Sequence, residues 1–252
     1  MQPSSPKKPQ PEPENKCPDC LYMKLEGIPV QSDSLEYFDV WQASTQTQQI
    51  ELHLTINFDE QWVSLKGGRI KFGLKGGELR LKLENSEIPY EFRNLAGSME
   101  LSLPEQKQEP ANLDKRIIEL RTRAFNSALN GSPTKDQASV NTEQRPASIC
   151  HITTKVSEEN PAWVFEEEMG ELVLRGSLHK TKLATLNVTA FPCRVEATFE
   201  VSKQDVYLTD AEGLWPPDIS RNKRAILDRL IVQRLLEPKF KPYLSKAVLH
   251  YD

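Results

Sequence analysis

Apolar residues at every second position are the feature that most constrains how this chain can fold. In residues 50–57, Ile50, Leu52, Leu54 and Ile56 alternate with polar or charged residues. Successive side chains of a β-strand point to opposite faces of a sheet, so this pattern predicts a strand with one buried and one solvated face.

The same alternation returns along much of the chain, in residues 70–74, 79–83, 99–103, 149–156, 163–165, 172–178, 183–188 and 195–207. Between the early runs stand Gly67-Gly68, Gly76-Gly77 and Asn85-Ser86, which predict tight turns. Antiparallel strands with one wet face are typical of this pattern. We therefore predict a mainly β fold, an antiparallel β-sandwich or jelly-roll-like arrangement with a C-terminal helix.

Two polar segments interrupt the strand pattern and divide the chain. Only 38% of the 252 residues are hydrophobic and 18 are proline, which is typical of a chain in which ordered and polar segments alternate. Residues 1–16 contain five prolines and too few apolar residues to offset the entropy lost on ordering, so we predict a disordered arm there. Residues 104–147 predict a polar linker or excursion with a short helix inside it. The ranges 17–103 and 148–252 then form a first and a second β unit.

The two β units share a short internal similarity. Phe72, Gly77-Glu78-Leu79 and Leu81 return at a constant offset as Phe165, Gly170-Glu171-Leu172 and Leu174. An internal duplication would explain this and predicts two similar β units, as two sandwiches or one larger one. A turn glycine, a solvent-facing Glu and two inward Leu also suit unrelated hairpins, so chance convergence stays open.

The C-terminal region changes to a helical period. Apolar residues between Ile226 and Leu236 recur at spacings of three and four, which predicts the best helix of the chain. Asp218 or Ser220 is suited to cap its N-terminus, and Pro238 is expected to end it. The apolar run Ala247–Tyr251 is expected to add a last strand.

The sharpest local motif is Cys17-Pro18-Asp19-Cys20. Two cysteines at this spacing can present two thiolates to one tetrahedral zinc ion, which needs two further ligands. Cys150 and Cys193 are the remaining cysteines, and His151 could replace Cys150 as a ligand. The alternative is that Cys150 and Cys193 are small buried apolar residues and that no cofactor is bound. Zinc is thus an alternative to the cofactor-free protein that we expect.

Basic residues gather in the predicted helix. The segment from Arg221 to Lys246 carries a charge of +6 against −4 for the whole chain, which leaves −10 for the rest. The basic residues of the helix itself are candidates to contact a partner: Arg221, Lys223, Arg224, Arg229 and Arg234. They could contact an acidic protein, a membrane surface or nucleic-acid phosphates, although an acidic chain is repelled by DNA at long range. The alternative is a helix whose apolar face caps the β core and whose basic face is solvated.

Catalytic and phosphate-binding motifs are missing from the sequence. The four histidines show no metal-ligand or triad spacing, and no nucleophile elbow, zinc-protease motif or phosphate-binding loop is present. We therefore predict a non-catalytic binding or assembly module that acts through protein–protein contacts. The alternatives are a nucleic-acid-binding accessory protein that uses the basic helix and a zinc-stabilised or metal-dependent protein. No segment is apolar enough to span a membrane and residues 1–16 do not resemble a secretory signal, so we expect a cytoplasmic protein.

Overall fold

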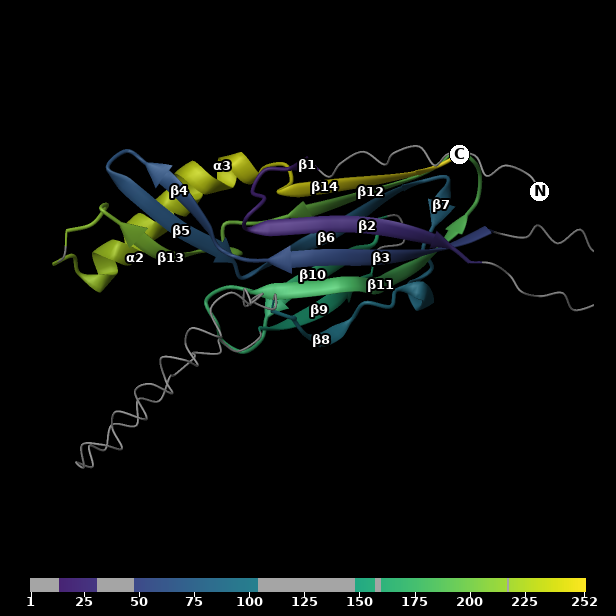
Figure 1. The fold of residues 1–252 in the computed structure, drawn as a ribbon, viewed down its shortest axis with the longest axis horizontal. Coiled ribbons are helices and arrows are strands. Elements are labelled where there is room, and N and C mark those ends of the chain that lie inside the picture. The colour runs from purple at the N-terminus through teal and green to yellow at the C-terminus, as the bar shows by residue number, and fades with distance from the viewer. Residues whose placement is uncertain (1–13, 31–47, 104–147, 157–159, 217) are drawn as a thin grey trace, which may run out of the picture. The chain divides into compact units, whose positions relative to one another are not determined.

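The computed structural model describes residues 14–30, 48–103, 148–156, 160–216 and 218–252. Within these ranges the chain is mostly β-strand, with antiparallel sheets in a sandwich-like arrangement and one helical region near the C-terminus (Figure 1). The predicted fold class is confirmed. The predicted linker, its short helix and the first thirteen residues of the predicted arm lie outside the described residues.

Two sheets lie face to face (Figure 1). The seven-stranded sheet contains, in order of pairing, β1 (Glu14–Asn15), β14 (Ser245–Tyr251), β12 (Cys193–Glu200), β6 (Gly76–Glu84), β10 (Ala162–Glu167), β9 (Ile149–Lys155) and β8 (Gly97–Glu100). The four-stranded sheet contains β2 (Leu21–Pro29), β3 (Gln48–Phe58), β11 (Gly176–Val188) and β7 (Ser86–Glu87). A short 3-10 helix, η1 (Tyr90–Phe92), follows β7.

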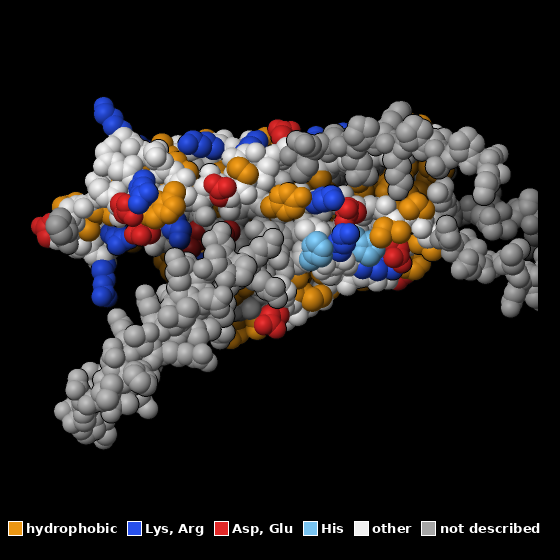
Figure 2. Space-filling model, in the orientation of Figure 1, with side chains coloured by type: hydrophobic (Ala, Val, Ile, Leu, Met, Phe, Trp, Pro, Cys, Tyr) orange, Lys and Arg blue, Asp and Glu red, His pale blue; other side chains and the backbone are white. Residues whose placement is uncertain are grey.

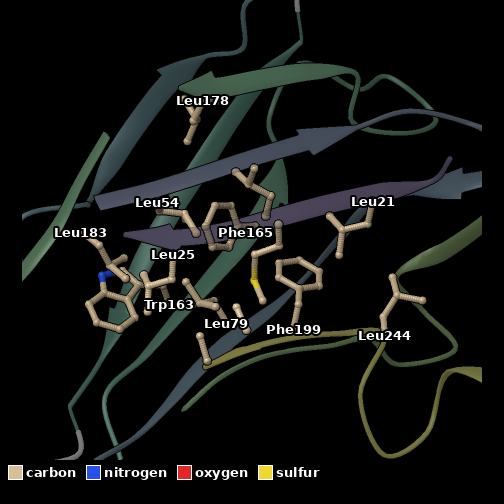
Figure 3. Close-up of a cluster of buried hydrophobic side chains, with 14 of the residues drawn as sticks. Leu21, Leu25, Leu54, Leu79, Trp163, Phe165, Leu178, Leu183, Phe199 and Leu244 are labelled. Atoms are coloured by element: carbon tan, nitrogen blue, oxygen red, sulfur yellow. The ribbon is translucent and has the colours of Figure 1, made fainter. Parts of the chain in front are cut away.

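The core fills the space between these two sheets. Phe58 of β3 lies 6.1 Å from Phe165 of β10 and 5.9 Å from Phe199 of β12, measured between ring centroids. The side chains of Trp163, Phe165 and Phe199 are fully buried, together with leucines of both sheets (Figure 3). The alternation of β3 is observed as predicted, because Ile50 and every second residue after it are buried up to Phe58.

Strands from both predicted β units pair with one another in the same sheets. β6 of the first range lies between β10 and β12 of the second, and β3 pairs with β11. The two ranges therefore build one sandwich. The similar segments differ in local structure, because Gly77 lies inside strand β6 whereas Gly170 lies in a loop with φ of +84°. Duplication remains a prediction about ancestry.

A three-stranded sheet and the helical region lie together at one end of the sandwich (Figure 1). The sheet contains β13 (Val206–Glu212), β5 (Gly68–Leu74) and β4 (Gln61–Leu65). The helical region consists of α2 (Arg221–Ile231), the π-helical turn η3 (Val232–Leu236) and α3 (Glu237–Phe240). Its anchors are the buried side chains of Val232, Leu236 and Phe240, and the Phe240 ring lies 5.7 Å from that of Phe72 in β5.

The predicted turn at Gly76-Gly77 is wrong. Both glycines belong to β6, neither has positive φ, and Lys75 alone separates β5 from β6. Their role is close packing, because a Cβ on Gly76 would lie 2.3 Å from the Phe165 carbonyl oxygen and one on Gly77 2.4 Å from the Phe199 ring. The turns at Gly67-Gly68 and Asn85 are confirmed, with φ of +98° at Gly67 and +57° at Asn85.

Pro238 does not end the helical region, contrary to the prediction. It lies in the first turn of α3, where proline needs no partner for the N–H that it lacks. The helix ends two residues later at Phe240. Lys241 is already extended, with ψ of 147°, as expected of a residue that precedes a proline.

Chain ends add to the seven-stranded sheet. Glu14 and Asn15, which the sequence assigned to the disordered arm, form β1 and pair with β14, and the Lys16 amide donates to the Leu244 carbonyl. The predicted last strand is confirmed as β14. Among the described residues, no helix has the length and apolar content needed to span a membrane.

Candidate protein-binding surface

The first half of the helical region contacts the core only through a partly buried side chain at its end, Ile231. Ser220 caps α2, with its hydroxyl accepting a hydrogen bond from the Lys223 amide, as the sequence predicted. None of the eleven residues of α2 is buried. Ile231 and the turns that follow α2 therefore attach the helix to the rest of the described chain, and the residues from Arg221 to Ile226 are exposed there.

The apolar side chains of the helical region are divided: Val232, Leu236 and Phe240 pack on the core, whereas three others remain in solvent. Ile226 is 60% exposed, Leu230 38% and Leu235 40%. Ile226 and Leu230 are four residues apart and so lie on one side of α2. Exposed large apolar side chains that gather in this way are typical of interaction surfaces.

The predicted basic residues surround these apolar side chains. All five candidates are exposed: Arg221, Lys223, Arg224 and Arg229 on α2 and Arg234 on η3. Arg224 lies 3.8 Å from Asp228, whereas within the described residues no ion pair is made by the other four. Figure 2 shows Lys and Arg side chains projecting from the end of the molecule that carries α2 and β13, with acidic and hydrophobic side chains beside them.

A groove lies between α2 and β13, with a volume of about 570 Å³. We call it the α2–β13 groove, and it is lined by Lys203, Gln204, Val206, Tyr207, Leu208, Ala225, Asp228, Arg229 and Val232. Val206, Leu208 and Val232 are buried and form an apolar floor, while Lys203 and Arg229 are exposed. The volume is within the range of sites that bind small molecules or parts of peptides.

Asp228 is the single acidic residue of the groove. Burial raises the pKa of its carboxyl, and Arg224 opposes this shift only in part. Its Oδ1 atom is buried and has no hydrogen-bond partner among the described residues. A ligand in the groove could donate a hydrogen bond to this oxygen.

Sequence reasoning identified the basic side of the groove and missed the opposite side. Lys203, Tyr207 and Leu208 follow β12 in the chain, and nothing in their own sequence indicates a site. Their place opposite the helix depends on how β13 pairs with β5 and how η3 packs on that sheet.

The cysteines do not converge. Cys17 and Cys20 share a tight turn in which the Cys20 amide donates to the Cys17 carbonyl, and both thiols are buried. Cys150 on β9 and Cys193 on β12 are separated by β10 and β6, hence by three strand spacings or about 14 Å.

Two of the thiols have raised pKa values, which favours their protonated form. A hydrogen bond that the Cys20 thiol donates to Cys17, together with burial, raises the pKa of Cys20, and burial raises the pKa of Cys150 to about 12. His151 contacts Ser98, with 3.3 Å between Nδ1 and Oγ. Among the residues that the structure describes, no group of three or more His, Cys, Asp and Glu is arranged to hold a metal ion, so the predicted four-ligand arrangement is not formed there.

Comparison with known proteins adds no relative to this description. No family model matches the sequence, and a search of curated proteins gives no match. The surface itself is the basis for assigning a function.

Proposed function

We propose that this protein is a non-catalytic binding module that recognises another protein through α2 and the α2–β13 groove. The observation that carries the proposal is a groove in which the exposed cations Lys203 and Arg229 flank an apolar floor, on a helix that exposes further apolar side chains outside the groove. Arg229 stands at its rim, Ile226 and Leu230 are exposed on the same helix, and Val206 lies on its floor. Protein interfaces combine an apolar centre with a polar rim in this way.

The composition of the surface favours a protein over a nucleic acid as the partner. Phosphate binding needs cations but gives no reason for Ile226 to be 60% exposed between them. Tyr207 is the aromatic residue among those that line the groove. Proteins that bind single-stranded nucleic acids usually stack successive bases on several aromatic side chains. A charge of −10 on the rest of the chain also disfavours approach to a polyanion.

The cytoplasmic location is part of the same proposal. Cysteines at positions 17, 20, 150 and 193 are all unpaired thiols, which suits a reducing compartment.

Site-specific photocrosslinking in cells tests the proposal. A photoreactive amino acid replaces Ala225, which lines the groove, and in a control chain it replaces Lys24, which lies on the outer face of β2. We expect a discrete crosslinked protein band from position 225 that is missing from position 24. Adducts with nucleic acid alone, or identical products from both positions, would contradict a protein-binding groove.

A further inference from the structure

β13 is an edge strand, and three of its residues line the groove: Val206, Tyr207 and Leu208. The order of the three-stranded sheet is β13, β5, β4, so β13 pairs with β5 alone. Within the described chain, no other strand or loop forms backbone hydrogen bonds with the residues of β13. Edge strands present unpaired N–H and C=O groups to which another extended chain can bind.

The helix provides the opposite wall of the groove, which thus forms a channel beside β13. Ala225, Asp228, Arg229 and Val232 line the groove, and their spacing of three, four and seven residues places them on one side of α2. Val206 and Leu208 face the floor from β13, ahead of the bulge between Leu208 and Asp210. A segment that lies in this channel thus meets a strand edge on one side and a helix on the other.

The charges of the channel select the chemistry of that segment. Lys203 and Arg229 form no ion pair with any described residue, and both are exposed at the rim. Asp228 is partly neutralised by Arg224, 3.8 Å away. Carboxylates on a ligand would pair with these cations, whereas a basic ligand would be repelled by them.

On the basis of the proposed function, we infer that the ligand is an extended acidic peptide of a partner protein, which adds to β13 as a further strand. Backbone hydrogen bonds to Val206–Leu208 hold the peptide in place. Because side chains alternate along a strand, every second residue can pack on the apolar floor and the residues between can present carboxylates to Lys203 and Arg229.

Peptide binding measured by fluorescence anisotropy tests the charge requirement. The probe is a fluorescein-labelled ten-residue peptide in which Glu alternates with Val, and the control peptide has Lys in place of Glu. We expect saturable binding of the Glu peptide and at least tenfold weaker binding of the Lys peptide. Equal binding of both peptides, or no binding of either, overturns the inference.

A backbone-modified probe tests the pairing with β13. Methylation of alternate backbone nitrogens, in two peptides that carry the methyl groups on opposite edges, removes N–H donors and leaves every side chain unchanged. We expect one of the two to lose at least tenfold in affinity, because one edge of the peptide must face β13. If neither methylated peptide is weakened, the peptide does not add as a strand and the inference fails, while a crosslink from position 225 would still support a binding groove.

Variants locate the binding in the groove. Arg229→Glu should weaken the Glu peptide at least tenfold, and Lys24→Glu, the same charge change on β2, should leave it unchanged. Asp228→Asn should tighten binding by roughly two- to fivefold, the size expected for removal of one partly exposed charge. Each variant is first checked for an unchanged melting temperature. If Arg229→Glu instead abolishes self-association of a protein that binds neither peptide, the groove belongs to a second copy and the inference is wrong.

Discussion

Glu60 is held between two cations where β3 leads into β4. Its carboxylate lies 2.9 Å from Lys71 Nζ and 2.6 Å from an Arg175 guanidinium nitrogen, and only 3% of its side chain is exposed. Burial would raise the pKa of Glu60, but its neighbours, with Lys71 and Arg175 among them, lower it below the usual value. The group therefore links the three-stranded sheet to the chain that leads into β11.

This pair of contacts makes stability depend on pH. A carboxyl whose pKa is lowered in the folded state stabilises that state above its unfolded pKa of about 4.5, and the contribution is lost as the pH falls through the folded pKa. We expect Glu60→Gln to lower the free energy of unfolding at pH 7 by about 2–4 kcal/mol, because it leaves two partly buried cations without a counter-charge. Urea unfolding at pH 7 and below pH 4 should show that the difference between the proteins shrinks in acid. Glu51→Gln, at an ion pair that is more exposed, serves as the control; an equal loss in both variants would contradict the special role of Glu60.

Gly77 is a second position where a small change, the addition of a Cβ atom, should lower the stability of the fold. A Cβ there would lie 2.4 Å from Phe199 Cε1 and 3.0 Å from the Glu200 carbonyl oxygen. The Phe199 ring packs against Phe165 at 5.8 Å and has no open space to move into. Gly77→Ala should destabilise the fold by about 1–3 kcal/mol through overpacking. An unchanged urea midpoint would show that the ring relaxes freely.

At the scale of the elements, α2 depends on its cap more than on packing. Ser220→Ala removes the side chain that accepts from the Lys223 amide and should cost the helix about 1 kcal/mol. Because no residue of α2 is buried, this loss should appear as faster hydrogen exchange in residues 221–231 and not as a lower melting temperature of the whole protein. Ser220→Asp keeps a capping oxygen and should preserve the protection. A matching fall in global stability would instead mean that α2 is part of the cooperative core.

Elements with a clear period could be predicted from the sequence, and their contacts could not. The alternation from Ile50 to Ile56 predicted strand β3, because apolar residues at every second position require one buried face. The apolar spacing of three and four after Ser220 predicted the helix. Gly76-Gly77 was misjudged because a glycine that prevents a clash with Phe199 looks, in sequence, like a glycine in a turn. The basic side of the groove followed from composition, whereas Lys203 and Tyr207 joined it through packing between segments distant in sequence.

Charged residues are arranged differently in two regions of the molecule. The helical part of the segment with charge +6 packs on the three-stranded sheet. On the seven-stranded sheet charges pair with one another: Glu196 contacts Arg194 and also Lys246, which is the last residue of that segment. Paired charges on a sheet face contribute to solubility and leave little for a partner. Unpaired cations beside apolar side chains occur at the helix, which is why binding is assigned to that end.

The way in which the two halves of the chain meet leads to a prediction about residues 104–147. Just before this segment the Leu101 amide donates to the Ser148 carbonyl at 2.9 Å, and Ser102 pairs with Ser177. The chain thus leaves and re-enters the sandwich at neighbouring points, and a short connection can join them. We expect a variant in which eight Gly and Ser residues replace residues 105–146 to fold and to be more stable by about 1 kcal/mol, because a shorter loop loses less entropy on closure.

Urea unfolding and peptide binding of this variant, beside the full chain, provide the measurement. Since β6 lies between β10 and β12, both halves should still unfold in a single transition. Binding of the Glu peptide should also be unchanged, because every residue that lines the α2–β13 groove follows the replaced segment in the chain. A variant that aggregates or loses more than about 2 kcal/mol would show that residues 105–146 contribute to the fold, since such a loss exceeds the effect of loop length.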